Sequence, residues 1–336
     1  MLSKIYEKIK IFIKENYKFI LSLIAIVFLL TYELPYVVYT PGGIVNLEKR
    51  ISVKNGYDSK GSINMSYVTL RKGNIPSILL SYVIKDWDLL KESEVTGSDE
   101  SVDDLLKLEK LYMTSSIDNA TILAYKKANK KINIKKNINN VIYVSENAKT
   151  DISLYDIILS VDGKDINNIK ELQDYIKTKN EGDIVYFKVI SNKKEVDRKA
   201  EVININGELK VGIAFLTTYE YETDPSITVK TKSSESGSSG GLMLSLAIYN
   251  AITKEDITKG KTIVGTGTID VLGNVGKIDG VKYKILGAVK NEADLFICPK
   301  DNYDEAMKVK KEHNLNINII SVETFDEAIN YLENNL

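Results

Sequence analysis

A glycine- and serine-rich segment leads directly into a long apolar segment, and this junction constrains the fold strongly. Residues 233–241 read Ser-Ser-Glu-Ser-Gly-Ser-Ser-Gly-Gly, and residues 242–252 are almost continuously apolar. A helix that is apolar on every face is buried on every face, so the second segment predicts a central helix. By composition alone the first segment also suits a flexible linker. At the start of a buried helix, however, it offers free backbone N–H groups that favour developing negative charge.

A serine in this loop needs a neighbouring base to become a nucleophile. The single histidine, His313, lies in the polar stretch 310–314, which is typical of a solvated helix end. Lysine is the known alternative partner of serine. Residues 281–290 predict a helix, and about 100° per residue places Lys282 inside its apolar stripe. A lysine held there is desolvated, which lowers its pKa toward that of a general base. The alternative is a lysine that extends from the rim of the stripe into solvent.

Several motifs follow one another in order over residues 208–336. They are Ser236 to Leu242 before the apolar helix, Gly265-Thr266-Gly267-Thr268-Ile269, Gly273-Asn274-Val275-Gly276, and Gly280-Val281-Lys282-Tyr283-Lys284 with Gly287-Ala288. This order resembles the proteolytic domain of Lon proteases. The resemblance implies an α+β fold and a Ser–Lys dyad, with Ser239 as nucleophile, Lys282 as base and Thr266 helping to position the lysine. Backbone N–H groups near Ser239 are expected to bind the oxyanion. The supporting glycines of the loop are Gly237, Gly240 and Gly241.

The serine loop departs from the family pattern. The family's Gly-Pro-Ser-Ala-Gly reads Gly-Ser-Ser-Gly-Gly at residues 237–241, Ser236 replaces a common Asp, and Asp279 replaces a common Gly. Without Pro and Ala the loop is expected to be more flexible and less preorganised. A membrane-tethered peptide-binding scaffold with a decayed protease domain therefore stays open. A second alternative is an α/β-hydrolase-like enzyme that uses His313, because Gly237-x-Ser239-x-Gly241 also fits a nucleophile elbow, although residues 232–236 before it are polar.

Residues 136–206 predict a second domain. Its expected order is a strand at 141–144, the segment DIILSVDGK at 156–164, a helix, Gly182-Asp183, and a strand at 184–189. This order resembles a PDZ domain, and such domains bind extended peptides by adding a strand to a sheet edge. The predicted edge is Val141, Ile142, Tyr143 and Val144. Asn140 and Tyr155 stand where the family has glycines, which argues against capture of a carboxyl terminus. The alternative is a β domain that acts only as a spacer.

The N-terminal region predicts a membrane anchor. Residues 19–35 begin with an uncharged apolar run, and the preceding tail, residues 1–18, carries a net charge of +3. The positive-inside rule then keeps the tail in the cytoplasm and places everything after residue 35 outside the cell membrane. The anchor implies contact with a lipid bilayer. A cleaved signal peptide and a buried core helix are the alternatives.

Composition excludes several classes of function. The 336 residues include 45 Lys and Arg against 46 Asp and Glu, so no overall basic surface indicates nucleic-acid binding. One cysteine and one histidine form neither an internal disulfide nor a Cys/His zinc site. No metal or cofactor is expected. An ATPase module is not expected either, because Gly260-Lys261-Thr262 lacks the earlier glycine of a phosphate loop and has Glu255 there.

Together these features predict an α+β multidomain chain. Its parts are the cytoplasmic tail, the transmembrane anchor, a mixed α/β segment at 36–135, the PDZ-like domain and a Lon-type proteolytic domain at 207–336. The whole resembles the bacterial membrane-anchored, PDZ-containing Lon-like proteases. The expected function is an extracytoplasmic serine endopeptidase that acts on proteins or peptides. The resemblance also implies that the chain can assemble into homo-oligomeric rings.

Overall fold

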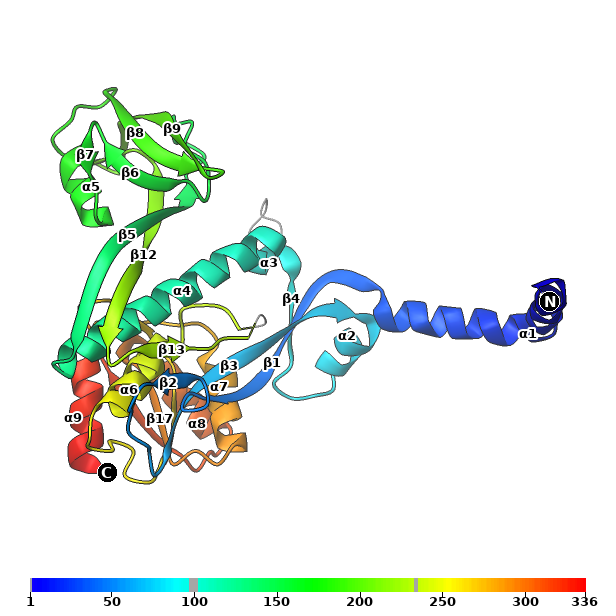
Figure 1. Ribbon diagram of the computed structural model, residues 1–336. Helices are drawn as coiled ribbons and strands as arrows, with labels where there is room; N and C mark the ends of the chain where they lie inside the picture. Colours follow the sequence, from blue (N-terminus) through cyan, green and yellow to red (C-terminus); the bar gives the residue numbers. More distant parts are fainter. Residues whose placement is uncertain (1, 97–101, 233–234) are drawn as a thin grey trace.

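The computed structural model describes residues 2–96, 102–232 and 235–336. In space it has three parts: an N-terminal helix that projects outward, a large mixed α/β body, and a small β-rich domain carried on a two-stranded arm (Figure 1). The N-terminus lies at the far end of the projecting helix, whereas the C-terminus lies in the body. The serine loop and the helix that follows it belong to the body.

Helix α1 (Leu2–Thr31) does not provide the predicted membrane anchor. Within the residues that the structure describes, no helix has both the length and the apolar character needed to cross a bilayer. Lysines recur along α1 as far as Lys18, so the uncharged part of the helix covers residues 19–31. That part is about 20 Å long at ~1.5 Å per residue, whereas the hydrocarbon core of a bilayer is about 30 Å thick.

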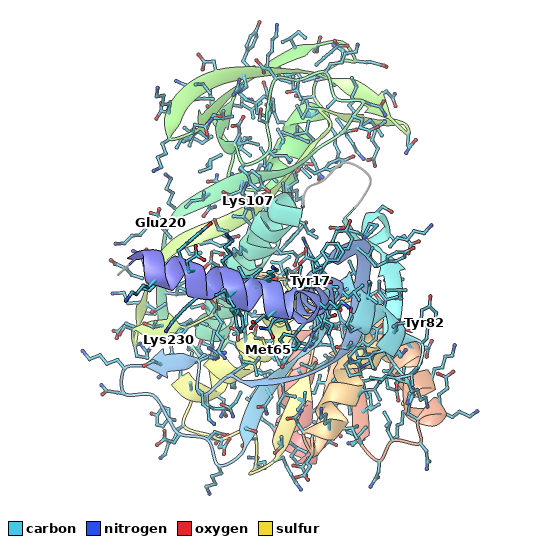
Figure 2. All side chains as sticks on the ribbon, turned by 90° about the vertical axis from the view of Figure 1, so that its right-hand side faces the viewer. Tyr17, Met65, Tyr82, Lys107, Glu220 and Lys230 are labelled. Carbon is cyan, nitrogen blue, oxygen red and sulfur yellow. The ribbon has the colours of Figure 1, made fainter. Side chains whose placement is uncertain are left out.

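The predicted single-pass transmembrane segment at 19–35 was therefore wrong. The contact with a lipid bilayer and the extracytoplasmic location, which were inferred from this segment, lose their support. The alternative of a buried core helix fails as well. Most of the large apolar side chains of α1 are exposed to solvent, and Tyr17 is 50% exposed (Figure 2).

A six-stranded sheet forms the centre of the body. Its order is β18 (Asn318–Val322), β17 (Leu295–Pro299), β14 (Thr262–Gly265), β3 (Ser62–Asn74), β1 (Glu33–Asn46) and β4 (Asp88–Lys91). The first four strands are parallel, and β1 runs antiparallel to β3 and β4. Every residue of β17 is buried, as expected for a parallel strand that is covered on both faces. Half of this sheet thus comes from the N-terminal third of the chain.

Helix α6 (Gly241–Ile252) confirms the predicted central helix. All residues from Gly241 to Ile248 are buried, because α6 packs between the sheet and the long helix α4 (Val102–Lys127). Helix α9 (Phe325–Asn335) completes this core. A second apolar cluster lies around α7 (Val281–Lys290), which confirms the predicted helix at 281–290, and α8 (Tyr303–Glu312). A short 3-10 helix, η1 (Lys300–Asn302), precedes α8.

Short elements surround the serine loop. Strand β2 (Ile51–Val53) pairs with β13 (Ile227–Val229), and β15 (Thr268–Ile269) pairs with β16 (Val275–Gly276). The Lys230 backbone N–H donates to the Arg50 carbonyl at 2.8 Å, which extends the β2–β13 pairing by one step. Segments far apart in the sequence therefore lie next to each other before the loop. Helices α2 (Ile75–Ser81) and α3 (Glu92–Thr96) flank the β4 edge of the large sheet.

The small domain is a twisted sheet with one helix. Its sheet order is β12 (Ile213–Asp224), β5 (Lys131–Val144), β6 (Ile157–Val161), β8 (Ile184–Ser191) and β9 (Lys194–Glu201), and β7 (Lys164–Asp165) pairs with β6. Helix α5 (Ile169–Ile176) and the hairpin of β10 (Ile203–Ile205) and β11 (Glu208–Lys210) cover its core. The long strands β5 and β12 continue into the body, where the Tyr219 N–H donates to Asp118 of α4 at 2.9 Å.

Candidate active site

Ser239 lies at the entrance to helix α6, and the backbone of its loop is tied down on several sides. The Ser239 carbonyl accepts hydrogen bonds from the Gly267 N–H at 2.8 Å and from Thr266 Oγ1 at 2.9 Å. The Leu242 N–H donates to the Gly267 carbonyl at 3.0 Å, and the Gly237 N–H donates to the Glu109 carbonyl at 3.0 Å. The loop that was expected to be loose for lack of Pro and Ala is thus held by the β14–β15 turn and by α4.

The backbone conformation of the loop favours glycine at position 237, and close packing favours glycine at positions 240 and 241. Gly237 has a φ of +87°, a left-handed conformation that side chains rarely adopt. Gly241 begins α6 in close contact with the β14–β15 turn, and an added Cβ would lie 2.7 Å from Ile269 Cγ2. At Gly240, where the family has Ala, an added Cβ would lie 2.7 Å from Met65 Sδ. The glycine-rich sequence therefore fits the packing around the loop.

A buried lysine stands behind the serine loop, and it is Lys284. Its side chain extends from α7, the residue is 4% exposed, and Nζ donates to Thr266 Oγ1 at 3.1 Å. Thr266 is fully buried, and its Oγ1 in turn donates a hydrogen bond to the Ser239 carbonyl. Burial lowers the pKa of Lys284 to about 8, and the Asp279 carboxylate partly opposes this shift. An amine with this pKa can accept a proton near neutral pH.

The predicted base, Lys282, points elsewhere. Its Nζ lies 2.7 Å from Asp88 Oδ2 and 3.6 Å from Asp86 Oδ1, and its side chain is 29% exposed. The neighbouring Tyr283 hydroxyl donates to the same Asp88 oxygen at 2.6 Å. Although burial acts in the opposite direction, these two hydrogen bonds lower the pKa of Asp88. Lys282 thus fixes the start of α7 to strand β4 and is not brought to Ser239.

The sequence did contain a signal for Lys284. The buried residues of α7 include Val281, Lys284, Ile285 and Ala288, which is the i, i+3, i+4, i+7 pattern of a core-facing stripe. A stripe drawn through Val281, Ile285 and Val289 fits the helical period almost as well and includes Lys282. Lys282 and Lys284 project about 160° apart around the helix axis, so only one of the two can face the core. Only the packing of α7 against β1 and β3 decides between them.

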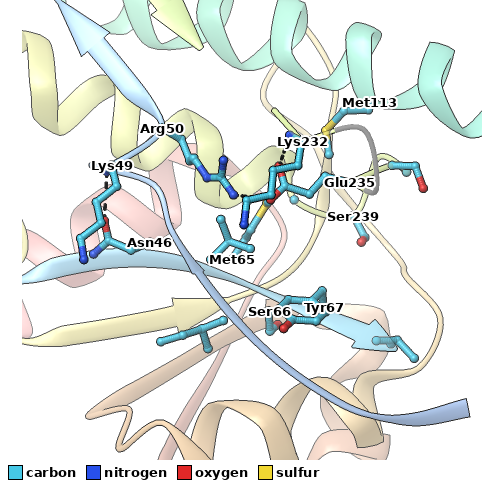
Figure 3. Close-up of a pocket in the computed structure, with 16 residues that line it drawn as sticks. Asn46, Lys49, Arg50, Met65, Ser66, Tyr67, Met113, Lys232, Glu235 and Ser239 are labelled. Atoms are coloured by element: carbon cyan, nitrogen blue, oxygen red, sulfur yellow. Dashed lines mark hydrogen bonds and ion pairs between the residues drawn. The ribbon is translucent and has the colours of Figure 1, made fainter. Parts of the chain in front are cut away.

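A cavity of about 620 Å³ opens beside Ser239 (Figure 3). Its apolar lining includes Met65, Tyr67 and Met113, which come from β3 and α4. Its charged lining includes Arg50 and Glu235, whose side chains form an ion pair at 2.5 Å. Ser239 and its loop form part of the cavity wall.

His313 takes no part in this site. It caps the C-terminus of α8, and its Nε2 lies 3.3 Å from Asp86 Oδ1, in the cluster that holds Lys282. The strand before the serine loop, β13, pairs antiparallel with β2, whereas a nucleophile elbow follows a strand of a parallel sheet. The arrangement therefore does not favour an α/β-hydrolase-like site. Among the described residues, no group of three or more His, Cys, Asp or Glu could hold a metal.

The PDZ-like domain has its own hollow, and it lies next to β12. The predicted edge, residues 141–144 of β5, pairs with β12, and the Val141 N–H also donates to the Asp156 carbonyl on the other side. Strand β12 is the last strand of its sheet. A hollow of about 370 Å³ lies between β12 and α5, and its mostly apolar lining includes Ile169, Leu172, Ile176, Leu209 and Ile213. The structure thus places an apolar groove at β12 instead of β5.

Known families match both domains. Residues 229–334 match the Lon protease (S16) C-terminal proteolytic domain, and residues 135–202 match the PDZ domain. The Lon protease of Campylobacter jejuni is 31% identical over 96 residues, which are 28% of this chain and 12% of that protein. The Lon protease of Metamycoplasma arthritidis is 33% identical over 96 residues, 29% of this chain and 11% of that protein. The archaeal Lon protease of Archaeoglobus fulgidus is 27% identical over 150 residues, 41% of this chain and 21% of that protein.

These matches confirm two parts of the predicted resemblance: the chain contains a Lon-type proteolytic domain and a PDZ domain. The chain spans between 11% and 21% of the length of these three relatives. The matched part of the chain includes Ser239, Thr266 and Lys284, the three residues that form the polar chain behind the loop.

Proposed function

We propose that this protein is a serine endopeptidase in which Ser239 is the nucleophile and Lys284 is the general base. One observation carries the proposal: a buried lysine of lowered pKa is joined through Thr266 to the residue whose hydroxyl lines a peptide-sized cavity. Lys282, which the sequence favoured as the base, is replaced by Lys284 because the ammonium of Lys282 is held by Asp88. The Lon-type match over residues 229–334 supports the reaction class.

The proposed reaction begins with a peptide in the cavity. Neutral Lys284 takes the proton of Ser239 Oγ, and Oγ attacks the scissile carbonyl to form a tetrahedral intermediate. Collapse of this intermediate expels the amine, which receives the proton from Lys284, and water then releases the acyl group from Ser239. In the described structure no hydrogen bond joins Lys284 Nζ to Ser239 Oγ. Such contacts often tighten only when substrate is bound.

The backbone of the loop offers a place for the oxyanion. The N–H groups of Gly237, Gly241 and Leu242 already have carbonyl acceptors. Those of Ser239 and Gly240 have none among the described residues, and they lie at the positive end of α6. We propose that these two groups stabilise the negative charge of the tetrahedral intermediate, which is commonly worth about a hundredfold or more in rate per donor.

The test is turnover of an unstructured protein by the full chain without added ATP. Wild type is expected to cleave it, and Ser239→Ala and Lys284→Met are both expected to be inactive while keeping the circular dichroism spectrum of the wild type. Cleavage that survives in Ser239→Ala would contradict the proposal. A wild type that cleaves nothing, but still binds peptides, would favour the second candidate alone.

A second candidate function is peptide binding by the PDZ domain. The observation that favours it is the apolar hollow between α5 and the terminal strand β12. We propose that an extended segment of a protein substrate pairs with the free edge of β12 and places an apolar side chain in this hollow. The domain would then recruit substrates for the site at Ser239.

A further inference from the structure

We propose that the cavity beside Ser239 selects substrates that carry an acidic side chain close to the scissile bond. This inference deepens the proposed endopeptidase function and rests on it. The cavity is large enough for more than one residue of an extended peptide, because its volume of about 620 Å³ falls within the range of sites that enclose drug-sized ligands. The charges on its wall, and not its size, carry the inference.

Three cationic side chains line one part of this wall. Lys49 and Arg50 follow β1, and Lys232 follows β13 (Figure 3). The two segments are held together because β2 pairs with β13 and the Lys230 N–H donates to the Arg50 carbonyl. The Lys49 N–H also donates to Asn46 Oδ1 at 3.0 Å, which fixes the turn after β1. The backbone of the two segments that carry this cationic wall is therefore fixed by the fold, whereas the side chains of Lys49 and Lys232 are exposed.

Among the described residues that line the cavity, the single carboxylate is that of Glu235, and both of its oxygens already accept hydrogen bonds. Glu235 Oε1 accepts from Arg50 at 2.5 Å, and Glu235 Oε2 accepts from the Lys232 backbone N–H at 2.8 Å. Its negative charge is therefore matched by the guanidinium of Arg50. Within the described part of the chain, the ammonium groups of Lys49 and Lys232 have no ion-pair partner, so the cavity keeps an excess of positive charge.

Acidic groups elsewhere near the loop do not offset this excess. Glu109 lies behind Gly237, where an added Cβ would be 2.9 Å from its Oε2, and it does not line the cavity. Burial raises the pKa of Glu109, which makes its charged form less favourable. A substrate carboxylate that enters the cavity thus meets two unpaired ammonium groups, whereas a substrate lysine meets like charges. Like-charge contact is a strong means of rejecting the wrong partner.

The experiment uses the full chain and fluorogenic peptides with blocked ends. Each peptide has one cleavable bond, and Asp, Ser or Lys replaces in turn each of the three residues on either side of it. At one position or more, Asp is expected to raise kcat/KM about five- to tenfold over Ser, and Lys is expected to lower it, as for contacts with two exposed charges. This preference should shrink at high salt, because exposed charges are screened.

Charge reversal then assigns the preference to the wall. Lys232→Glu is expected to invert the Asp-over-Lys ratio, and Lys49→Glu is expected to reduce it. The matched control is Lys188→Glu, which makes the same change in net charge on an exposed position of β8 in the PDZ domain and is expected to leave the ratio unchanged. A ratio that is unaffected by Lys232→Glu, or equally affected by Lys188→Glu, overturns the inference.

A binding measurement distinguishes failure of the acidic preference from failure of the proposed endopeptidase function. The same blocked peptides are measured for binding to Ser239→Ala by fluorescence polarisation, which needs no hydrolysis. Tighter binding of the Asp peptide, lost in the Ser239→Ala/Lys232→Glu double variant, supports the acidic subsite even if wild type shows no cleavage. Equal binding of the Asp and Lys peptides contradicts the inference even if wild type cleaves both.

Discussion

The cavity at Ser239 and the hollow in the PDZ domain differ in the charge and polarity of their lining. The cavity at Ser239 is lined by charged and polar groups and lies in front of a buried lysine, whereas the hollow between α5 and β12 is mainly apolar. The first has the groups that proton transfer and charge stabilisation require. The second has the groups that bind an apolar side chain and a free strand edge. Under the proposed functions, chemistry and recognition take place in separate hollows, with the β5–β12 arm between them (Figure 1).

The largest effect should come from the two lysines of α7. Lys284→Met keeps the length and the apolar contacts of the side chain but removes the amine, so kcat/KM should fall about a thousandfold, within the range of general-base removal. Lys282→Met should lower kcat/KM less than tenfold, because the contacts that it breaks, with Asp86 and Asp88, lie outside the chain of contacts to Ser239. Both variants are measured on one peptide, with thermal unfolding as the control for folding. Equal losses in the two variants would remove the distinction between them.

The next largest effect should be the pH dependence of the reaction rate at Ser239. Burial lowers the pKa of Lys284 to about 8, and the neutral amine is the active form. The rate should therefore rise about tenfold per pH unit below 8 and level off above 9. Single-turnover rates of acyl-enzyme formation between pH 6 and 10 check this. Binding of an uncharged apolar peptide to the hollow at α5 should be flat over the same range, and a flat rate at Ser239 would argue against Lys284.

A smaller effect should separate recruitment from chemistry. Ile169→Glu places a charge in the apolar hollow, so the KM for a protein substrate should rise about five- to thirtyfold, since burying the apolar side chain of a substrate there is worth about 1–2 kcal/mol. The kcat for a short peptide should not change. Lys170→Glu, at the next position of α5 and outside the hollow, is the matched control. A parallel fall of kcat would show that the two sites are not separate.

The smallest effect should be at Gly237. An alanine there must keep a φ near +87° and displace the Glu109 carboxylate, so Gly237→Ala should lower the free energy of unfolding by ~1 kcal/mol. Chemical denaturation of the full chain measures this. In the PDZ domain, Gly182 has a similar φ of +88° with open space around it, and Gly182→Ala separates backbone strain from the contact with Glu109.

The sequence indicated the serine loop and Thr266, but not which residues and strands lie next to them. The Gly/Ser loop and the apolar helix after it were found from composition, and Thr266 from the resemblance to the Lon proteolytic domain; the structure brings Ser239 and Thr266 together. The sequence favoured Lys282 as the base, whereas the structure pairs Lys282 with Asp88 and buries Lys284, which we propose as the base, two residues later on α7. For the PDZ domain, the pattern of strands was recognised, but residues 141–144 were taken as an edge because their pairing with β12, some 70 residues later, was not apparent.

The sequence by itself determined the local features of this protein: a helix too apolar to be exposed, a loop of small residues before it, and the patterns of two known domains. Only the tertiary structure decided which lysine of α7 is buried and contacts Thr266, since the rotation of a helix depends on what packs against it. It also decided the charge of the cavity, whose wall joins residues after β1 and β13. Periodicity fixes the spacing along one element, whereas the meeting of distant elements depends on their packing.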